Sequence, residues 1–251
     1  MKILLLSDLH GEARWYEWLL EAAKRYDCVA LAGDLIDMFQ APQPQLEFLR
    51  DRWFPRFTAA AVPLAFCTGN HDFGLAEWLP ELVGSDRVVA DGVTRLVRTD
   101  AGEALLLTTV PYIWNFSTVG SHGLVALWER GAELRLATGA PWLVLHHEPP
   151  AGLAPAPVSN QLESWLARYT PDYVSSGHFH GGPNRRRRFA QRVAASLCFN
   201  GGQTKDAPWP NHIVLDLGDG TATWRRAVVG PASWTEQSRT IALSGDWAVE
   251  L

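Results

Sequence analysis

The segment Ile3-Leu-Leu-Leu6-Ser7-Asp8-Leu9-His10 sets the pattern from which the fold of this chain is predicted. An apolar run with strand character ends abruptly in residue types that bind metals. The same change follows the apolar runs at 29–31, 64–66, 142–145 and 173–174. Segments with helical composition lie between these runs, at 13–25, 43–57, 75–82, 124–136 and 159–169. Alternating strands and helices predict an α/β fold with a largely parallel central sheet.

A second group of segments has a different character. Hairpin-type strands are expected at 88–97, 104–109, 193–199, 212–217 and 221–227, separated by turn residues such as Asp100-Ala-Gly102. These strands predict a second, partly antiparallel sheet. Two mixed sheets packed face to face, with helices on the outer faces, would bury the apolar majority of the chain. Beyond Pro231 we predict no further element.

The composition indicates one ordinary globular domain over residues 1–251. Hydrophobic residues make up 47% and charged residues 20%, and no Pro/Gly/Ser-rich or charged linker divides the chain. The formal net charge is -5, so the surface as a whole does not attract polyanions. Any attraction for a phosphate group must therefore be local.

Cysteine usage and hydropathy indicate the compartment. Cys28, Cys67 and Cys198 stand in apolar runs, which suits buried reduced thiols better than disulfides or a zinc site. The N-terminus has too few consecutive apolar residues for a secretory signal, and no apolar run in the sequence is long enough to span a membrane. We expect a cytoplasmic protein without membrane contact, and the sequence leaves its oligomeric state open.

Polar residues at the strand ends are the candidates for the chemistry of the chain. Loops that leave the carboxyl ends of strands in an open α/β sheet meet at one edge. The candidates there are Asp8, His10, Asp34, Asp37, Asn70, His71, Asp72, His146, His147, His178 and His180. Carboxylate and amide oxygens combined with imidazoles suit Mn²⁺, Fe or Zn²⁺. Because there are more such groups than one cation needs, we expect two metals.

Each short motif also has an ordinary structural explanation. An Asp-x-His or His-x-His pair is often a solvated surface loop, and Gly33-Asp34 after a strand is often a turn. The segment Asn70-His71-Asp72 would cap a helix that begins near Leu75. The joint occurrence of all the motifs, each at the end of its own strand, favours one metal centre over unrelated loops.

The complete series resembles a known superfamily. Its blocks are Asp8-Leu-His10, Gly33-Asp34-Leu-Ile-Asp37, Gly69-Asn70-His71-Asp72, His146-His147-Glu-Pro and Gly177-His178-Phe-His180. In this order they resemble the calcineurin-like metallophosphoesterases, over residues 8–180. The resemblance implies a four-layer α/β/β/α sandwich, in which the strands after residue 190 belong to the second sheet.

The resemblance also implies a ligand set for two divalent metals, Mn²⁺ or Fe first and Zn²⁺, Ni²⁺ or Mg²⁺ as alternatives. One metal would be held by Asp8, His10 and His180, the other by Asn70, His178 and a histidine of the fourth block, with Asp34 bridging them. The adjacent histidines make that fourth block ambiguous. We prefer His147, because His147-Glu-Pro matches the family's His-x-Pro pattern, and we place His146 in the strand or behind the ligands.

His71 resembles the family histidine that lies over the phosphate and protonates the leaving oxygen. Asp37 would orient that imidazole, and its alternative is a helix-start residue. The implied reaction is hydrolysis of a phosphodiester or phosphomonoester by hydroxide that the two metals generate, with His71 as general acid on the opposite side.

The substrate is less defined than the reaction. Tyr112, Trp114 and Asn115 lie on an expected rim segment, where they would touch a base or sugar or simply pack the loop. The basic run 185–188, which begins at Arg185, would attract a second phosphate or a nucleic-acid backbone, or form a solvated hairpin. We expect a small nucleotide-like ester first, a DNA or RNA nuclease second, and a non-catalytic binding scaffold third.

Overall fold

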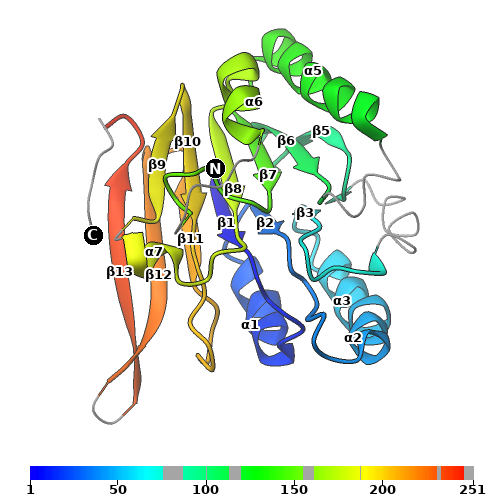
Figure 1. Ribbon diagram of the computed structural model, residues 1–251, viewed down its shortest axis with the longest axis vertical. Helices are drawn as coiled ribbons and strands as arrows, with labels where there is room; N and C mark the ends of the chain where they lie inside the picture. Colours follow the sequence, from blue (N-terminus) through cyan, green and yellow to red (C-terminus); the bar gives the residue numbers. More distant parts are fainter. Residues whose placement is uncertain are drawn as a thin grey trace.

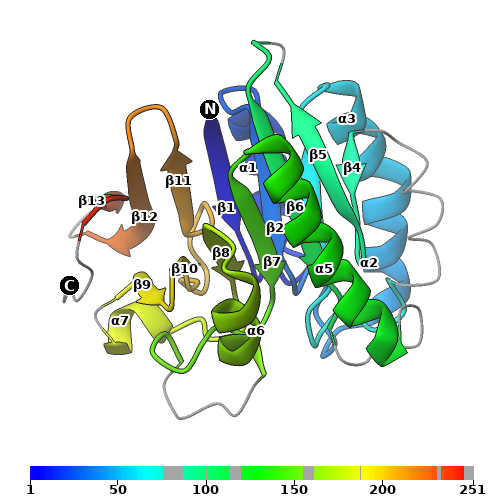
Figure 2. The same cartoon turned by 90° about the horizontal axis from the view of Figure 1, so that it is seen from above.

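The computed structural model describes residues 1–75, 87–99, 101–112, 120–154, 161–186, 188–230 and 233–245. Within these residues, two mixed β-sheets pack face to face and helices cover both outer faces (Figures 1 and 2). The predicted α/β sandwich of two mixed sheets is confirmed. Among the described helices, none combines the length and apolarity needed to cross a membrane.

The first sheet contains seven strands in the order β13-β12-β11-β1-β2-β3-β4. Their bounds are β1 Lys2–Leu6, β2 Cys28–Ala32, β3 Leu64–Cys67, β4 Val88–Val89, β11 His212–Asp216, β12 Thr221–Val229 and β13 Trp234–Ala242. Strands β1 to β4 are parallel to one another, whereas β11 pairs antiparallel with β1 and continues into the antiparallel strands β12 and β13. The carboxyl ends of β1, β2 and β3 therefore lie at the same edge.

The second sheet contains six strands in the order β5-β6-β7-β8-β10-β9. Their bounds are β5 Thr94–Arg98, β6 Ala104–Val110, β7 Trp142–His146, β8 Tyr173–Ser176, β9 Ala190–Val193 and β10 Ser196–Asn200. The four inner strands are parallel, and the edge strands β5 and β9 are antiparallel to their neighbours. The carboxyl ends of β7 and β8 thus also share one edge.

The helices fall into two groups. Helices α1 (Ala13–Ala23), α2 (Pro42–Phe48) and α3 (Phe54–Ala59) pack on the first sheet, and α5 (Gly120–Thr138) and α6 (Leu162–Tyr169) pack on the second. A π-helical turn, η1 (Leu49–Trp53), joins α2 to α3, where one uninterrupted helix was predicted. Pro55 has no N–H to donate, so a regular helix cannot continue unchanged through this point. The extra residue in the turn keeps Leu49, Trp53 and Phe54 buried.

Alternation along the strands builds the layers of the core. In β1, Leu4 and Leu6 face the helices while Ile3 and Leu5 face the second sheet. Strand β7 repeats the arrangement, with one set of side chains toward α5 and α6 and the other toward the first sheet. The inner strands of both sheets are therefore apolar on both faces, which explains the nearly continuous apolar runs in the sequence. The three cysteines are buried free thiols within these layers.

Two sequence-based predictions about the strands are wrong. The segment 88–97 is not one strand: β4 belongs to the first sheet and β5 to the second, and the chain turns between them at Gly92, whose φ is 73°. The strands after residue 190 are not all in the second sheet, because β11, β12 and β13 extend the first sheet beside β1. Strand patterns record which residues are buried but not which sheet buries them.

The remaining differences concern the ends of elements. Strand β13 was not predicted, because its exposed edge position leaves little apolar pattern to detect. Arg185 lies on the short helix α7 (Gly182–Arg186) and not in a hairpin. The helix predicted over 75–82 lies outside the described residues except for its first residue.

Candidate metal centre

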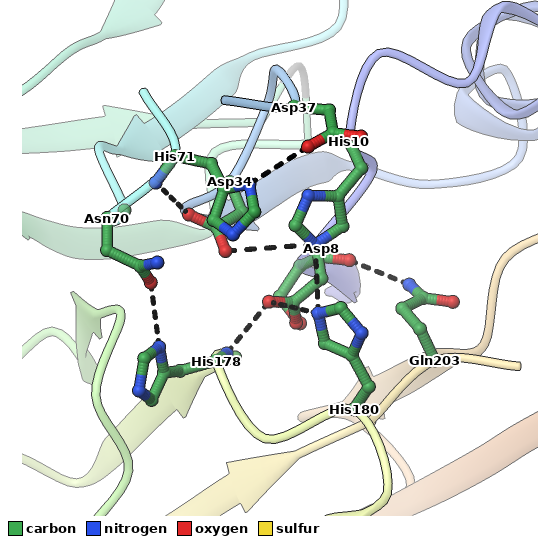
Figure 3. A network of polar contacts seen from close by, with 12 residues as sticks. Asp8, His10, Asp34, Asp37, Asn70, His71, His178, His180 and Gln203 are labelled. Atoms are coloured by element: carbon green, nitrogen blue, oxygen red, sulfur yellow. Dashed lines mark hydrogen bonds and ion pairs between the residues drawn. The ribbon is translucent and has the colours of Figure 1, made fainter. Parts of the chain in front are cut away.

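The loops that follow β1, β2, β3, β7 and β8 converge at one edge of the two sheets (Figure 3). Backbone hydrogen bonds hold the first two loops side by side, from Asp8 N to Gly33 O at 2.9 Å and from His10 N to Asp34 O at 2.9 Å. The loop after β8 joins them through the N–H of His178, which donates to Asp8 Oδ1 at 2.8 Å. Residues far apart in the sequence thus face one another across a small space.

One group of side chains contains Asp8, His10 and His180. The Nε2 atoms of His10 and His180 lie 2.8 Å apart, and His180 Nε2 lies 3.4 Å from Asp8 Oδ1 (Figure 3). Asp8 is fully buried, and Ser7 Oγ donates to its Oδ2 at 2.5 Å. Together with Asp34 these residues offer ligand atoms within 4.8 Å of one another.

A second group contains Asn70, His147 and His178. Asn70 Oδ1 lies 2.7 Å from His178 Nδ1 and 3.0 Å from His147 Nε2. His147 is 2% exposed, and its Nδ1 faces the carbonyl of Ala32 at 2.8 Å. An Nδ1–H donated to this carbonyl leaves the lone pair on Nε2 directed into the group.

Asp34 lies between the two groups. Its Oδ2 is 3.3 Å from His147 Nε2 and 3.8 Å from His10 Nε2, while its Oδ1 accepts the backbone N–H of His71 at 2.8 Å. This carboxylate contacts the imidazole ring of a histidine from each group.

The structure distinguishes the adjacent histidines of the fourth block. His146 is the last residue of β7 and has the same orientation as Val144, toward the outer helices, whereas His147 follows the inward orientation of Leu145. The Nδ1 atom of His146 faces the carbonyl of Glu148 at 2.8 Å. It is the His147 ring of this pair that contacts Asn70 and Asp34.

The donor set fits divalent cations. When the Nδ1 atom of His147 carries the proton, its Nε2 lone pair points at Asn70 Oδ1 and Asp34 Oδ2, so that three acceptors converge. The two facing Nε2 atoms of His10 and His180 are a similar arrangement. Converging acceptors repel one another unless protons or cations lie between them, and this mixture of oxygen and nitrogen donors suits first-row divalent metals.

His71 and Asp37 lie beside these groups. His71 Nδ1 is 3.3 Å from Asp37 Oδ1 and 3.2 Å from the backbone nitrogen of Met38. Asp37 Oδ1 also accepts the backbone N–H of Phe39 at 3.0 Å, so its carboxylate is fixed in the turn. The His71 ring packs edge-on against the His10 ring, with centroids 4.4 Å apart.

Comparison with protein families agrees with this geometry. Residues 1–182 match the model of the calcineurin-like phosphoesterases, which covers more than half of the chain. The chain belongs to this family. The family is described as calcineurin-like phosphoesterases, and Asp8, His10, Asp34 and His180 of this chain form a cluster that could hold a metal ion. No match was found among curated protein sequences.

Solved structures confirm that the family fold extends over nearly the whole chain. A protein described as TT1561, from Thermus thermophilus, aligns with a TM-score of 0.57 and 16% identity, covering 96% of this chain and 98% of that one. A dimetal phosphatase from Danio rerio aligns with a TM-score of 0.59 and 12% identity, covering 97% and 99% respectively. At these identities the likeness shows the fold.

The charged groups of the candidate site change one another's pKa values. Burial disfavours the charged imidazole of His147, but the Asp34 and Asp8 carboxylates outweigh it and raise the pKa of His147 to about 9. Asp8 raises the pKa of His180 in the same way against the effect of burial. Burial lowers the pKa of His10 and of His178. The carboxylates thus attract positive charge to both groups of the site.

The structure describes two of the four residues that were predicted to line the rim of the site, Tyr112 and Arg185. Tyr112 lies beside the site, with its ring centroid 5.7 Å from that of His147 and its hydroxyl 3.1 Å from Glu148 Oε1. Trp114 and Asn115 lie outside the described residues. Arg185 is exposed and packs beside Gly181, one residue after His180.

The sequence placed Asp72 among the polar residues at the strand ends but did not predict that it fixes the loops, and it did not predict this role for Asn200 or Gln203. Asp72 accepts the N–H groups of Ile36 and Gly69, and Asn200 donates to the carbonyl of Gly177 at 2.9 Å. Gln203 donates to the carbonyl of Ser7 at 2.7 Å (Figure 3). The available signal was weak, because Asn200 ends a buried strand and Gln203 follows it, and polar residues at such positions fit a substrate rim equally well.

Proposed function

We propose that this chain is a binuclear metal-dependent phosphoesterase that hydrolyses a small, nucleotide-like phosphodiester or phosphomonoester. The observation that carries the proposal is the position of Asp34 Oδ2, 3.3 Å from His147 Nε2 and 3.8 Å from His10 Nε2. A carboxylate flanked by two separate donor groups suits a pair of cations. A single-metal site would need only one of these groups.

The two donor groups define the proposed ligands. Asp8, His10 and His180 hold one cation, Asn70, His147 and His178 hold the other, and Asp34 bridges them. Mn²⁺ or Fe is favoured, with Zn²⁺, Ni²⁺ or Mg²⁺ as alternatives, because the oxygen and imidazole donors include no thiolate. When bound, such cations lower the pKa of water and neutralise charge on the phosphoryl oxygens.

The chain's own residues complete the proposed reaction. As general acid, His71 would donate the Nε2 proton of its imidazolium form to the leaving oxygen of the ester and be left as a neutral imidazole. The Asp37 carboxylate, 3.3 Å from Nδ1, stabilises the ring when it becomes charged. His71 is therefore the proposed acid and Asp37 its positioning residue.

Metal analysis combined with hydrolysis assays tests the proposal. We expect the native protein to bind two divalent ions and to hydrolyse p-nitrophenyl phosphate or bis(p-nitrophenyl) phosphate only when loaded. Asp34→Asn lowers metal content and turnover together, whereas His71→Ala keeps the metals and slows turnover, most for poor leaving groups. Asp51→Asn, at an exposed position on η1, is the matched control.

Several results would contradict the proposal. Equal hydrolysis by metal-stripped and metal-loaded protein excludes a metal-dependent enzyme. Metal binding without hydrolysis of either ester, cyclic nucleotides or single-stranded DNA identifies a binding scaffold. Preferential cleavage of single-stranded DNA identifies the nuclease alternative.

A further inference from the structure

Exposed apolar side chains gather on the two loops that carry the proposed acid. The exposed large hydrophobic residues among those described are Met38 (51%), Phe39 (84%), Phe73 (75%), Leu136 and Val229. Met38 and Phe39 stand next to each other on the loop that follows β2, and Phe73 stands on the loop that follows β3. Isolated exposed apolar residues are common, but several on the loops of one candidate site indicate a binding surface.

Each of the three residues is tied directly to His71. The backbone N–H of Met38 is directed at His71 Nδ1 at 3.2 Å, and the backbone N–H of Phe73 donates to the His71 carbonyl at 2.8 Å. The Phe39 ring stands edge-on to the His71 ring, with centroids 5.3 Å apart and an interplanar angle of 82°. The Phe39 ring therefore lies against the proposed acid, and the backbones of the exposed residues Met38 and Phe73 are anchored to the same histidine.

The backbone that carries the Phe39 ring is held in a turn. Its N–H donates to Asp37 Oδ1 at 3.0 Å, and the turn is closed by the N–H of Gln40, which donates to the Asp37 carbonyl at 3.1 Å. A ligand would then have to order only the side-chain torsions of Phe39 and not its backbone. The loop backbone is thus preorganised to receive an apolar group.

The charges of the two loops define what kind of group fits. Residues 33–41 and 68–74 contain Asp34, Asp37 and Asp72 but no Lys or Arg. Asp34 and Asp72 are buried, so a leaving group with a further phosphate would meet the Asp37 carboxylate on these loops and no Lys or Arg to pair with it. The surface is also far smaller than a stable protein interface, which buries roughly 800 Å² on each partner. A single uncharged ring fits both constraints.

We infer that Met38, Phe39 and Phe73 form a subsite for the leaving group of the ester, and that this leaving group carries an uncharged aromatic ring. The inference rests on the proposed function, because it assigns the leaving group to the side of His71. Phe39 and Phe73 are then specificity-determining residues, whose contacts are made in the ground state and the transition state alike.

Two phosphonates that differ in an aromatic ring test the inference. Neither is hydrolysed, so their inhibition constants report binding alone and not the reactivity of a leaving group. Benzylphosphonate and methylphosphonate are compared as competitive inhibitors of whichever p-nitrophenyl ester the metal-loaded protein hydrolyses. We expect the inhibition constant of benzylphosphonate to be about tenfold lower in the native protein, from partial burial of one ring. This ratio falls toward one in Phe39→Ala and in Phe73→Ala and is partly kept in Phe39→Leu.

A matched control and a kinetic readout separate binding from damage to the acid. Leu136→Ala removes an equally exposed apolar side chain from helix α5 and leaves the ratio unchanged. Phe39→Ala raises KM for the p-nitrophenyl ester while kcat stays within about twofold, because the lost contact is uniform binding. A large loss of kcat would instead show that His71 had moved, and Phe73→Ala then decides the outcome.

The possible failures are distinguishable from one another. Absence of any metal-dependent hydrolysis contradicts the proposed function itself. Hydrolysis with equal inhibition by both phosphonates, or with no inhibition by either, overturns the aromatic subsite alone. A tenfold ratio that persists in both alanine variants also overturns it, because the ring would then bind elsewhere.

Discussion

Left-handed backbone conformations gather at the candidate metal centre. Asp8, His10, Asp34 and His178 have φ values of 57°, 46°, 55° and 67°. For residues with a Cβ this region costs roughly 1 to 2 kcal/mol each. The hydrogen bonds between the loops hold these conformations, and each turn directs a side chain into the site. The backbone at these residues is therefore locally strained, and the same strained turns bring the side chains together in the site.

The backbone at Gly33 passes so close to the His147 ring that only glycine, which has no Cβ, fits there. Its φ is 84°, and a Cβ built there would clash with the Nδ1 and Cγ atoms of His147. We expect Gly33→Ala to displace the His147 ring and to lower metal content. Gly102→Ala is the matched control, because Gly102 has a φ of 83° and nothing within 4 Å of its built Cβ.

The comparison separates backbone strain from the clash. Both variants lose about 1 kcal/mol from the left-handed conformation, but only Gly33→Ala should lose metal in elemental analysis and unfold at a clearly lower temperature. Normal metal content in Gly33→Ala would show that His147 does not depend on this approach.

At the level of the elements, Asp72 joins the loops after β2 and β3. Its Oδ1 accepts the N–H of Ile36 at 3.0 Å and its Oδ2 accepts the N–H of Gly69 at 2.7 Å. The side chain is 1% exposed. Because these loops carry Asp34 and Asn70, one buried carboxylate fixes the spacing between a proposed bridging ligand and a ligand of the second group.

Replacement of Asp72 by Asn should affect stability and metal affinity together. The amide of Asn accepts one of the two N–H groups and turns its own donors toward the other, which leaves that N–H unsatisfied. We expect a loss of about 2 kcal/mol in the free energy of unfolding and about a tenfold weaker metal affinity. Urea titration and metal-competition assays measure the two effects.

Asp172→Asn is the control at an element far from the site. Asp172 accepts the backbone N–H of Trp142 at 2.9 Å and pairs with Arg135, at the opposite end of β7 from the metal centre. It should lower stability and leave metal affinity unchanged. If Asp72→Asn behaved in the same way, the loops would be held by other contacts.

For the whole molecule, His212 links stability to pH. It begins β11, is 3% exposed, and its Nδ1 faces the carbonyl of Pro210 at 3.0 Å. Burial lowers the pKa of His212 to about 4, and the charges of Arg225 and Arg25 act in the same direction. The folded protein therefore holds this imidazole neutral at a pH where the unfolded chain protonates it.

The sign of the effect follows from the two pKa values. The unfolded pKa of about 6.5 lies above the folded value, so the stabilisation is complete above about pH 6.5. It is lost as the pH falls toward 4, by up to about 3 kcal/mol. We expect His212→Asn, which keeps a donor for the Pro210 carbonyl, to lose correspondingly less stability in urea between pH 7.5 and pH 4.5.

The difference between the native protein and the variant isolates this contribution. Histidines of the metal centre titrate in both proteins, so their effects cancel as long as the distant sites are independent. Parallel pH profiles for the two proteins would show that His212 does not titrate as the structure indicates.

Most of the strands could be predicted from local patterns of apolar and polar residues in the sequence. The strands near residues 3, 29, 64, 142 and 173 were predictable because each is a short apolar run that ends in polar residues. Their division between two sheets was not, because both sheets bury both faces of their strands and leave the same pattern in the sequence. The sequence also did not show that β4 and β5 belong to different sheets. It did not predict β13, because this exposed edge strand has little apolar pattern.

The sequence by itself determined which residue types end the strands, and hence the candidate ligands Asp8, His10, Asp34, Asn70, His178 and His180, together with His71 and Asp37. Only the tertiary structure decided that His147 and not His146 faces Asn70, that Asp34 contacts both groups, and that Phe39 and Phe73 stand exposed beside His71. The physical reason is that ligand chemistry is a property of each side chain, whereas orientation depends on strand pairing, turns and contacts between residues distant in sequence.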